Sequence, residues 1–383
     1  MRPDQVSLGV LVTAIPRDAV DAAIAGCGVG ERRRGGKLPA HVVAYLTLAM
    51  CLFPEDDYEE VATKVTGAFD RLGCWNAGWT VPTAGGISQA RKRLGPKVLA
   101  EVFETIAGPA AEPSTRGAWL RDWRLMAIDG FEVDLPDTPD NAAEFGYSGS
   151  GDNRSAFPKA RVVALAECGT HTFLAAEVGA WSVGEKTLAR RLLPRLNPDE
   201  LLTADRNFYS FDAWELAART GAALCWRAPT QLQLPVVGVL EDGSYLSVLI
   251  HPDVRGRRRD ELLAAAAAGD DLDDEPAHLV RVIEYDVPDR DGNGTGELIV
   301  LLTNICDPEQ ARADELAAAY AERWEEETGN DQLKTHLRGP RRMLRSKLPE
   351  LAHQEIWAWL LVHHALAHLI TRAADAIDID PDR

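Results

Sequence analysis

The chain has 383 residues, 46% of them hydrophobic, which is enough to bury a large core in two or three structural units. Its formal charge of -18 disfavours nucleic-acid binding by the surface as a whole. Any such binding must therefore use local clusters of basic residues. The six cysteines include no CxxC pair, which argues against a zinc site or disulfide framework and favours reduced thiols in the cytoplasm. The longest early apolar run, residues 42–53, is too short to span a bilayer, so we expect no membrane partner.

The N-terminal part of the chain is predicted to be helical. Apolar residues recur at helical spacing in residues 6–15 and 42–53, and strand patterns are absent. Residues 87–94 (ISQARKRL) predict a short basic helix, with Ser88 as a possible cap and Gly95 at its end. The candidate DNA contacts on it are Arg91, Lys92 and Arg93. A solvated basic helix is the alternative.

Two aspartates follow short apolar strands further along the chain. Asp129 ends residues 125–128, and Gly130 after it would let a ligand approach the backbone. Asp205 ends residues 201–204, with Arg206 beside it and a helical pattern behind it. Ligand sites of doubly wound α/β units lie at the carboxyl ends of strands, so both residues are candidates for one site. Taken singly, each could be structural, as part of a DG turn or as a helix cap.

The sequence from about residue 229 onward changes to short strand patterns, which predict a β-rich insertion. It contains the segment AAAAAGDDLDDE, which we expect to be a disordered or mobile loop.

The stretch YAERWEEETGNDQLK, residues 320–334, carries polar residues at helical offsets. Tyr320, Arg323, Glu327 and Lys334 fall within one arc of about 60° on a helical wheel, whereas the neighbouring glutamates point elsewhere. A carboxylate among cations can hold a metal ion while the cations hold phosphate oxygens, as an enzyme acting on a phosphodiester requires. A solvated helix with i,i+4 ion pairs remains the alternative.

This spacing of Tyr, Arg, Glu and Lys resembles the signature of the IS4 family of bacterial DDE transposases. Both segments that carry the aspartates resemble the same family. So do SQARKRLG and FGYSGSGDNRSAFPKARVVALAECGTH, which are similar to actinobacterial members. The resemblance covers nearly the whole chain.

The resemblance implies an α/β fold with an RNase H-like catalytic core, a β-rich insertion and a helical N-terminal domain. The expected division is a DNA-binding domain at 1–115, the first part of the core at 116–228, the insertion at 229–300 and the second part of the core, with the catalytic glutamate helix, at 301–383.

The same resemblance implies that three acidic residues ligate two Mg²⁺ or Mn²⁺ ions. Oxygen-only ligands favour these ions over zinc. These are Asp129, Asp205 and Glu327. It also implies contacts to DNA phosphates from Tyr320, Arg323 and Lys334. Arg206 is a further candidate DNA contact. Trp324 is a candidate to receive a displaced base, or else a packed core residue.

The implied reaction is cut-and-paste transposition of an insertion sequence at its terminal inverted repeats. It comprises nicking, hairpin formation and opening, and strand transfer. The partners would be double-stranded DNA of the element ends and target, and a second copy of the chain in the DNA complex. We expect the protein in the cytoplasm, on the nucleoid when it binds DNA. The alternatives are a catalytically inactive or domesticated relative that acts as a DNA-binding regulator, and a metal-free carboxylate-pair hydrolase such as a glycosidase.

Overall fold

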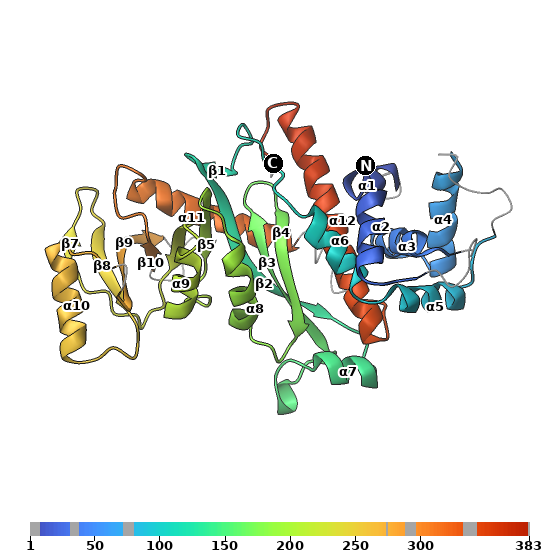
Figure 1. The fold of residues 1–383 in the computed structure, drawn as a ribbon, viewed down its shortest axis with the longest axis horizontal. Helices are drawn as coiled ribbons and strands as arrows, with labels where there is room; N and C mark the ends of the chain where they lie inside the picture. The colour runs from blue at the N-terminus through green and yellow to red at the C-terminus, as the bar shows by residue number, and fades with distance from the viewer. Residues whose placement is uncertain are drawn as a thin grey trace.

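The computed structural model describes residues 8–30, 38–71, 80–272, 275–287, 296–331 and 343–381, with only the backbone of 8–10, 66–71 and 324–331. A central sheet separates a helical unit formed by the N-terminal part from a strand-rich extension at the opposite side (Figure 1). No helix within these ranges is both long and apolar enough to cross a membrane.

A ten-stranded mixed sheet forms the centre of the molecule, in the order β4-β3-β2-β5-β6-β10-β9-β8-β7, with β1 paired to β2. Neighbours in β4-β3-β2 are antiparallel, whereas β5 runs parallel to β2 and β6 parallel to β5. The strands of this half are β1 (Trp119–Leu120), β2 (Trp123–Asp134), β3 (Lys159–Glu167), β4 (Thr172–Ala180), β5 (Glu200–Ala204) and β6 (Ala223–Arg227). Both expected aspartate-bearing strands are therefore present, although β2 continues past Asp129 to Asp134 instead of ending there.

Helices cover both faces of this half of the sheet. Side chains alternate along a strand, so Met126 and Ile128 pack beneath α8 (Glu185–Leu192) and α9 (Phe211–Ala218). Leu125 and Ala127 face the other way, into the core that contains Tyr320 of α11 (Ala313–Asp331). Near-continuous apolar runs such as residues 125–128 result from this two-sided burial.

The second half of the sheet continues the first. β10 (Glu297–Thr303) pairs antiparallel with β6 and leads to β9 (Ala277–Val287), β8 (Tyr245–Ile250) and β7 (Gly238–Val239). The strands expected for the insertion thus extend the main sheet, and the expected boundary at residue 300 falls inside β10.

The alanine tract that we expected in a mobile loop is instead helical. It forms the end of α10 (Arg257–Ala268), where Ala266 is buried with Leu262 against the apolar side of the extension. Gly269 ends the helix with a left-handed conformation, φ 81°. Alanine has the highest helix propensity, and one apolar stripe suffices to dock the helix.

The N-terminal unit packs around the C-terminal helix α12 (Pro349–Asp375), which lies between this unit and β4 (Figure 1). A single core joins residues of the N-terminal helices, of β2 to β4 and of α12. The helices of the N-terminal unit are α1 (Leu8–Ala14), α2 (Arg17–Gly26), α3 (Ala40–Leu52), α4 (Tyr58–Arg71), α5 (Ala84–Leu94) and α6 (Val98–Ile106). Two short elements, α7 (Pro139–Phe145) and η2 (Gly151–Asn153), connect β2 to β3, and η3 (Leu193–Arg195) follows α8.

Candidate active site

The two aspartates follow directly on a matched pair of residues in neighbouring parallel strands. Ile128 of β2 is paired with Ala204 of β5, so Asp129 and Asp205 begin at the same level of the sheet. Both paired residues belong to the core beneath α8 and α9. Alternation therefore directs the aspartates to the opposite face, which α11 covers.

Helix α11 packs against β2, β5 and β6 and carries the remaining predicted residues. Tyr320 and Arg323 are only 2% and 4% exposed, and the Arg323 Cζ atom lies 5.6 Å from the centre of the Tyr320 ring. Burial raises the pKa of Tyr320, an effect that Arg323 opposes and the negative charge of Asp205 reinforces. The Tyr320 end of the helix therefore packs on the β2 and β5 face of the sheet, near Asp205.

Three predicted residues lie partly or wholly outside the described residues. Glu327 and Trp324 belong to the described backbone of α11, but their side chains are not described. Lys334 lies outside the described ranges altogether. Glu327 follows Tyr320 by seven residues, close to two helical turns, so the backbone keeps them on one face.

Glu185 is a neighbour of the aspartates that sequence reasoning missed. It is the first residue of α8, and its carboxyl group lies on the backbone of Gly130. Burial raises the pKa of Glu185, and the negative charge of Asp129 raises it further, against the opposing effect of Arg161. The space beside Gly130, which we expected to admit a ligand, is therefore filled by a carboxyl group of the chain itself. The sequence feature that could have identified Glu185 is an acidic residue in the first turn of the helix after β4.

The donor set can be compared with what a metal ion requires. Among the described side chains, which do not include that of Glu327, no three His, Cys, Asp or Glu residues are gathered closely enough to hold a metal ion. Asp129 and Asp205 offer oxygen ligands only, which fits Mg²⁺ or Mn²⁺ better than zinc.

The basic helix of the N-terminal unit differs from expectation at Arg91. Its guanidinium is fully buried and donates hydrogen bonds to Gln354, Ser346, the Tyr58 hydroxyl and the Leu351 carbonyl. The prediction that it contacts DNA is wrong, because these groups occupy its donors.

The rest of this helix also departs from the sequence analysis in part. Its cap is Thr83 rather than Ser88, because the helix begins at Ala84. Lys92 and Arg93 are exposed, so both remain available to a partner.

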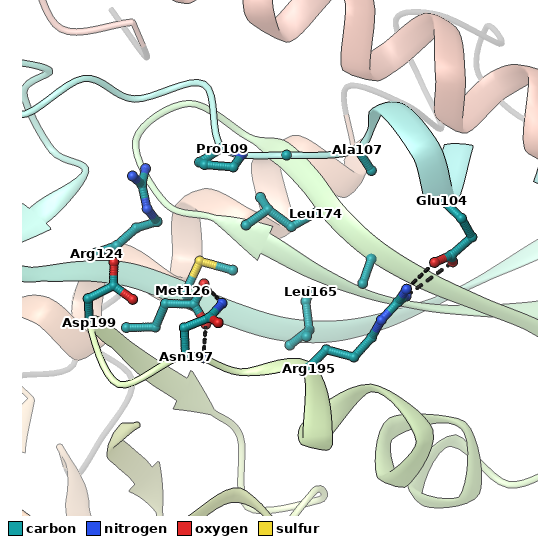
Figure 2. A pocket seen from close by; sticks show the side chains of 13 residues that line it. Glu104, Ala107, Pro109, Arg124, Met126, Leu165, Leu174, Arg195, Asn197 and Asp199 are labelled. Carbon is teal, nitrogen blue, oxygen red and sulfur yellow. Dashed lines mark hydrogen bonds and ion pairs between the residues drawn. The ribbon is translucent and has the colours of Figure 1, made fainter. Parts of the chain in front are cut away.

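A cavity of about 440 Å³ lies near the other end of β2, lined by Arg124 and Arg195 (Figure 2). Both cations are neutralised, since Arg195 pairs with Glu104 and Arg124 with Glu167. Asp199 and Glu200 add negative charge to the wall. This cavity is therefore unsuited to a phosphate.

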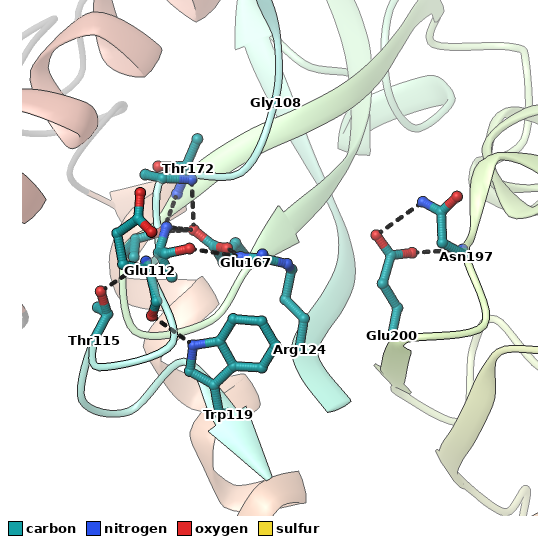
Figure 3. Close-up of polar contacts among 12 residues, drawn as sticks. Gly108, Glu112, Thr115, Trp119, Arg124, Glu167, Thr172, Asn197 and Glu200 are labelled. Carbon is teal, nitrogen blue, oxygen red and sulfur yellow. Dashed lines mark hydrogen bonds and ion pairs between the residues drawn. The ribbon is translucent and has the colours of Figure 1, made fainter. Parts of the chain in front are cut away.

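Glu167 is the centre of a hydrogen-bond network at the Arg124 end of β2 (Figure 3). Its carboxylate accepts hydrogen bonds from the backbone N–H groups of Ala110 and Ala111, both 2.9 Å, and from the Thr170 hydroxyl at 2.6 Å. Arg124, stacked on the Trp119 ring at 4.4 Å, completes the network. These contacts fasten the connection between α6 and β1, which is a structural role.

Three antiparallel strands are followed by two parallel ones, with Asp129 within β2 and Asp205 directly after β5. This arrangement defines an RNase H-like core. The comparisons then specify the class. The family model described as "Transposase DDE domain" matches residues 122–364, and "Insertion element 4 transposase N-terminal" matches residues 5–104. The chain therefore belongs to the DDE transposase family, with an N-terminal region of the insertion element 4 type, and its function is DNA transposition.

Individual relatives agree with this assignment. The chain is 26% identical over 347 residues to the transposase InsG of insertion sequence element IS4 from Escherichia coli strain K12, covering 89% of this chain and 72% of that protein. It is also 26% identical over 200 residues to the putative transposase InsZ of the same organism, covering 52% and 63%. A piggyBac transposase in a synaptic complex with hairpin DNA has a similar fold, with a TM-score of 0.50 at 9% identity, over 96% of this chain and 76% of that one.

Proposed function

We propose that Asp129, Asp205 and Glu327 together bind two divalent ions, Mg²⁺ or Mn²⁺, and that this site cuts and rejoins DNA at the ends of an insertion sequence. The observation that carries the proposal is the register of β2 and β5, which sets the two aspartates side by side beneath α11. Glu327 lies on that helix, further along the face that carries Tyr320.

Electrostatics explains why such a site needs cations. Carboxylates gathered in one place resist full ionisation, because each negative charge raises the free energy of the next. Glu185, on the other side of Gly130, adds to this negative potential. When bound, two divalent ions would supply charge neutralisation and Lewis-acid stabilisation of the attacking and leaving oxygens.

The cations of α11 complement this role. Arg323 is buried beside Tyr320, on the side of the helix where the charge of Asp205 is felt. A guanidinium in this position can hold a phosphate oxygen with two donors and so orient the strand. We assign the same role of contacting DNA phosphates to Lys334 and to the hydroxyl group of Tyr320. We assign the reception of a displaced base to Trp324.

The reaction that follows from this proposal is nicking at the terminal inverted repeats, hairpin formation, hairpin opening and strand transfer to target DNA. Two ends must be held together, so we propose a homodimer in the DNA complex. Lys92 and Arg93, exposed on α5, would contact the phosphates of the element ends.

The test is cleavage of duplex oligonucleotides that carry the ends of the element, with Mg²⁺, Mn²⁺ or EDTA. We expect cleavage only with a divalent ion, and a loss of at least about 100-fold in Asp129→Asn, Asp205→Asn and Glu327→Gln. Circular dichroism confirms that each variant is folded. Cleavage by all three variants at the wild-type rate, or undiminished activity in EDTA, would disprove the assignment.

A further inference from the structure

A second cavity, of about 560 Å³, adjoins the proposed site. Arg206 and Asn207, the residues after Asp205, form one wall, and Lys186, the residue after Glu185, forms another. The start of α9 and the connection after β6 complete it. The cavity therefore lies beside the end of β5, next to Asp205, and the start of α8.

The charge of this cavity is opposite to that of the chain as a whole. Lys186 and Arg206 are exposed cations that line it, and none of the described residues that line it is acidic. This stands out in a chain with a formal charge of -18. In the cavity of Figure 2, by contrast, both arginines are paired with glutamates and further acids line the wall. The cavity beside Arg206 therefore suits an anionic ligand, whereas the cavity of Figure 2 does not.

The two cations are positioned differently. The Lys186 ammonium donates a hydrogen bond of 2.9 Å to the carbonyl of Tyr209, which also lines the cavity. Arg206 makes no side-chain hydrogen bond or ion pair with any residue that the structure describes. Its donors are available in a fork that suits phosphate oxygens.

Two aromatic residues, Tyr209 and Phe211, line the cavity, and Phe211 does not offer a free stacking surface. The Phe211 ring packs against the rings of His251 and His278, with centroids 5.0 and 5.1 Å away, and the side chain is buried. A base would need a free aromatic face. Tyr209 is partly buried against the core beneath α8 and α9, so the two cations, which suit a phosphate, decide the chemistry of the cavity.

We propose that this cavity binds backbone phosphates of the DNA strand next to the phosphodiester that is cut, with Arg206 and Lys186 as their contacts. The inference rests on the proposed function, since it places that phosphodiester at Asp129 and Asp205. The contacts are to phosphate, so the binding contributes affinity and register without selecting a sequence.

The experiment is fluorescence anisotropy with a labelled DNA duplex of arbitrary sequence, in EDTA so that no cleavage occurs, at several salt concentrations. Each phosphate contact contributes a slope of about 0.9 to the dependence of log Kobs on log salt. Arg206→Ala and Lys186→Ala should each lower that slope by about one such unit and weaken binding several-fold at low salt. Arg195→Ala, which removes an equal charge from the cavity of Figure 2, is the matched control and should leave the slope unchanged.

Several outcomes would overturn the inference. These are an unchanged slope in both variants, an equal loss in Arg195→Ala, or tighter binding of a free deoxynucleoside monophosphate than of the duplex. Thermal unfolding of the three variants confirms equal folding. Failure here is distinguishable from failure of the proposed function, because Asp129→Asn and Asp205→Asn test cleavage while retaining Arg206 and Lys186.

Discussion

The carboxyl group of Glu185 occupies the space into which a side chain at residue 130 would project. A Cβ atom at Gly130 would lie 2.8 Å from the Glu185 Cδ atom and 3.1 Å from its Cγ atom, with Oε1 closer still. This contact links the start of α8 to the strand residue next to Asp129. It also explains a glycine in the middle of a strand where no turn requires one.

Gly130→Ala should displace the Glu185 side chain from its position. Because the Glu185 side chain is flexible, we expect a loss of only about 1 kcal/mol in the free energy of unfolding, measured by urea denaturation. In a Glu185→Ala background the same substitution should cost nothing, since the colliding atoms are gone. Equal costs in the two backgrounds would show that the two residues are not coupled.

Glu185→Gln should stabilise the protein at neutral pH in EDTA. Burial and the charge of Asp129 raise the pKa of Glu185 in the folded state, so the ionised form opposes folding above that pKa. The variant should therefore have the higher Tm at pH 7 to 8, and the difference should disappear as pH falls below about 4.3, the unfolded-state pKa of glutamate.

Glu215→Gln removes the same charge from α9, where Glu215 forms a surface pair with Arg219, and serves as the control. It should not raise the Tm. An equal rise in both variants would assign the effect to net charge rather than to the surroundings of Glu185.

Arg91→Ala and Lys92→Ala should behave in opposite ways although the residues are neighbours. Arg91 is buried with donors bound to α12 and to Ser346, so its loss should cost about 3 kcal/mol of stability. Lys92 is exposed, so its loss should change stability by less than about 0.5 kcal/mol. Chemical denaturation measures both.

DNA binding provides the second readout for this pair. Lys92→Ala should lower the salt slope of duplex binding by about 0.9, as expected for one lost phosphate contact. A folded Arg91→Gln variant, which loses the charge, should keep the wild-type slope. A slope lowered as much in Arg91→Gln as in Lys92→Ala would contradict the structural role of Arg91.

His363 should make the protein less stable as pH falls. Burial lowers the pKa of His363 to about 4, while its Nε2 atom lies 2.7 Å from the His171 carbonyl. A depressed pKa means that the unfolded chain binds the proton first. Stability is thus full above about 6.5 and is lost toward pH 4, by up to about 3 kcal/mol.

The measurement is the free energy of unfolding against pH for the wild type and His363→Phe. Phenylalanine can keep the packing on Phe173, whose ring lies 4.5 Å from that of His363, but it binds no proton. The variant should be less stable at pH 7 and show a shallower pH dependence between pH 6.5 and 4. Parallel curves would exclude His363 as the titrating group, leaving His364, whose pKa burial also lowers to about 4.

Local patterns were sufficient for much of this fold. Apolar runs that end in acids predicted β2 and β5, and the periodicity of residues 320–334 placed Tyr320 and Glu327 on one face of a helix that does form up to residue 331. These features depend on side-chain alternation and helical pitch, which act over a few residues. Patterns failed at the alanine tract of α10, where composition suggested disorder and helix propensity with one buried stripe prevailed.

The sequence by itself determined which residue types are present at strand ends and on one helix face, and through its motifs the family of the protein. Only the tertiary structure decided which of them meet. It paired Ile128 with Ala204, buried Arg91 against α12, brought Glu185 onto Gly130 and left Arg206 in a cavity whose described lining residues include no acid. The reason is physical, since each of these contacts joins residues from different elements, and packing and strand register, rather than local propensity, set their distances.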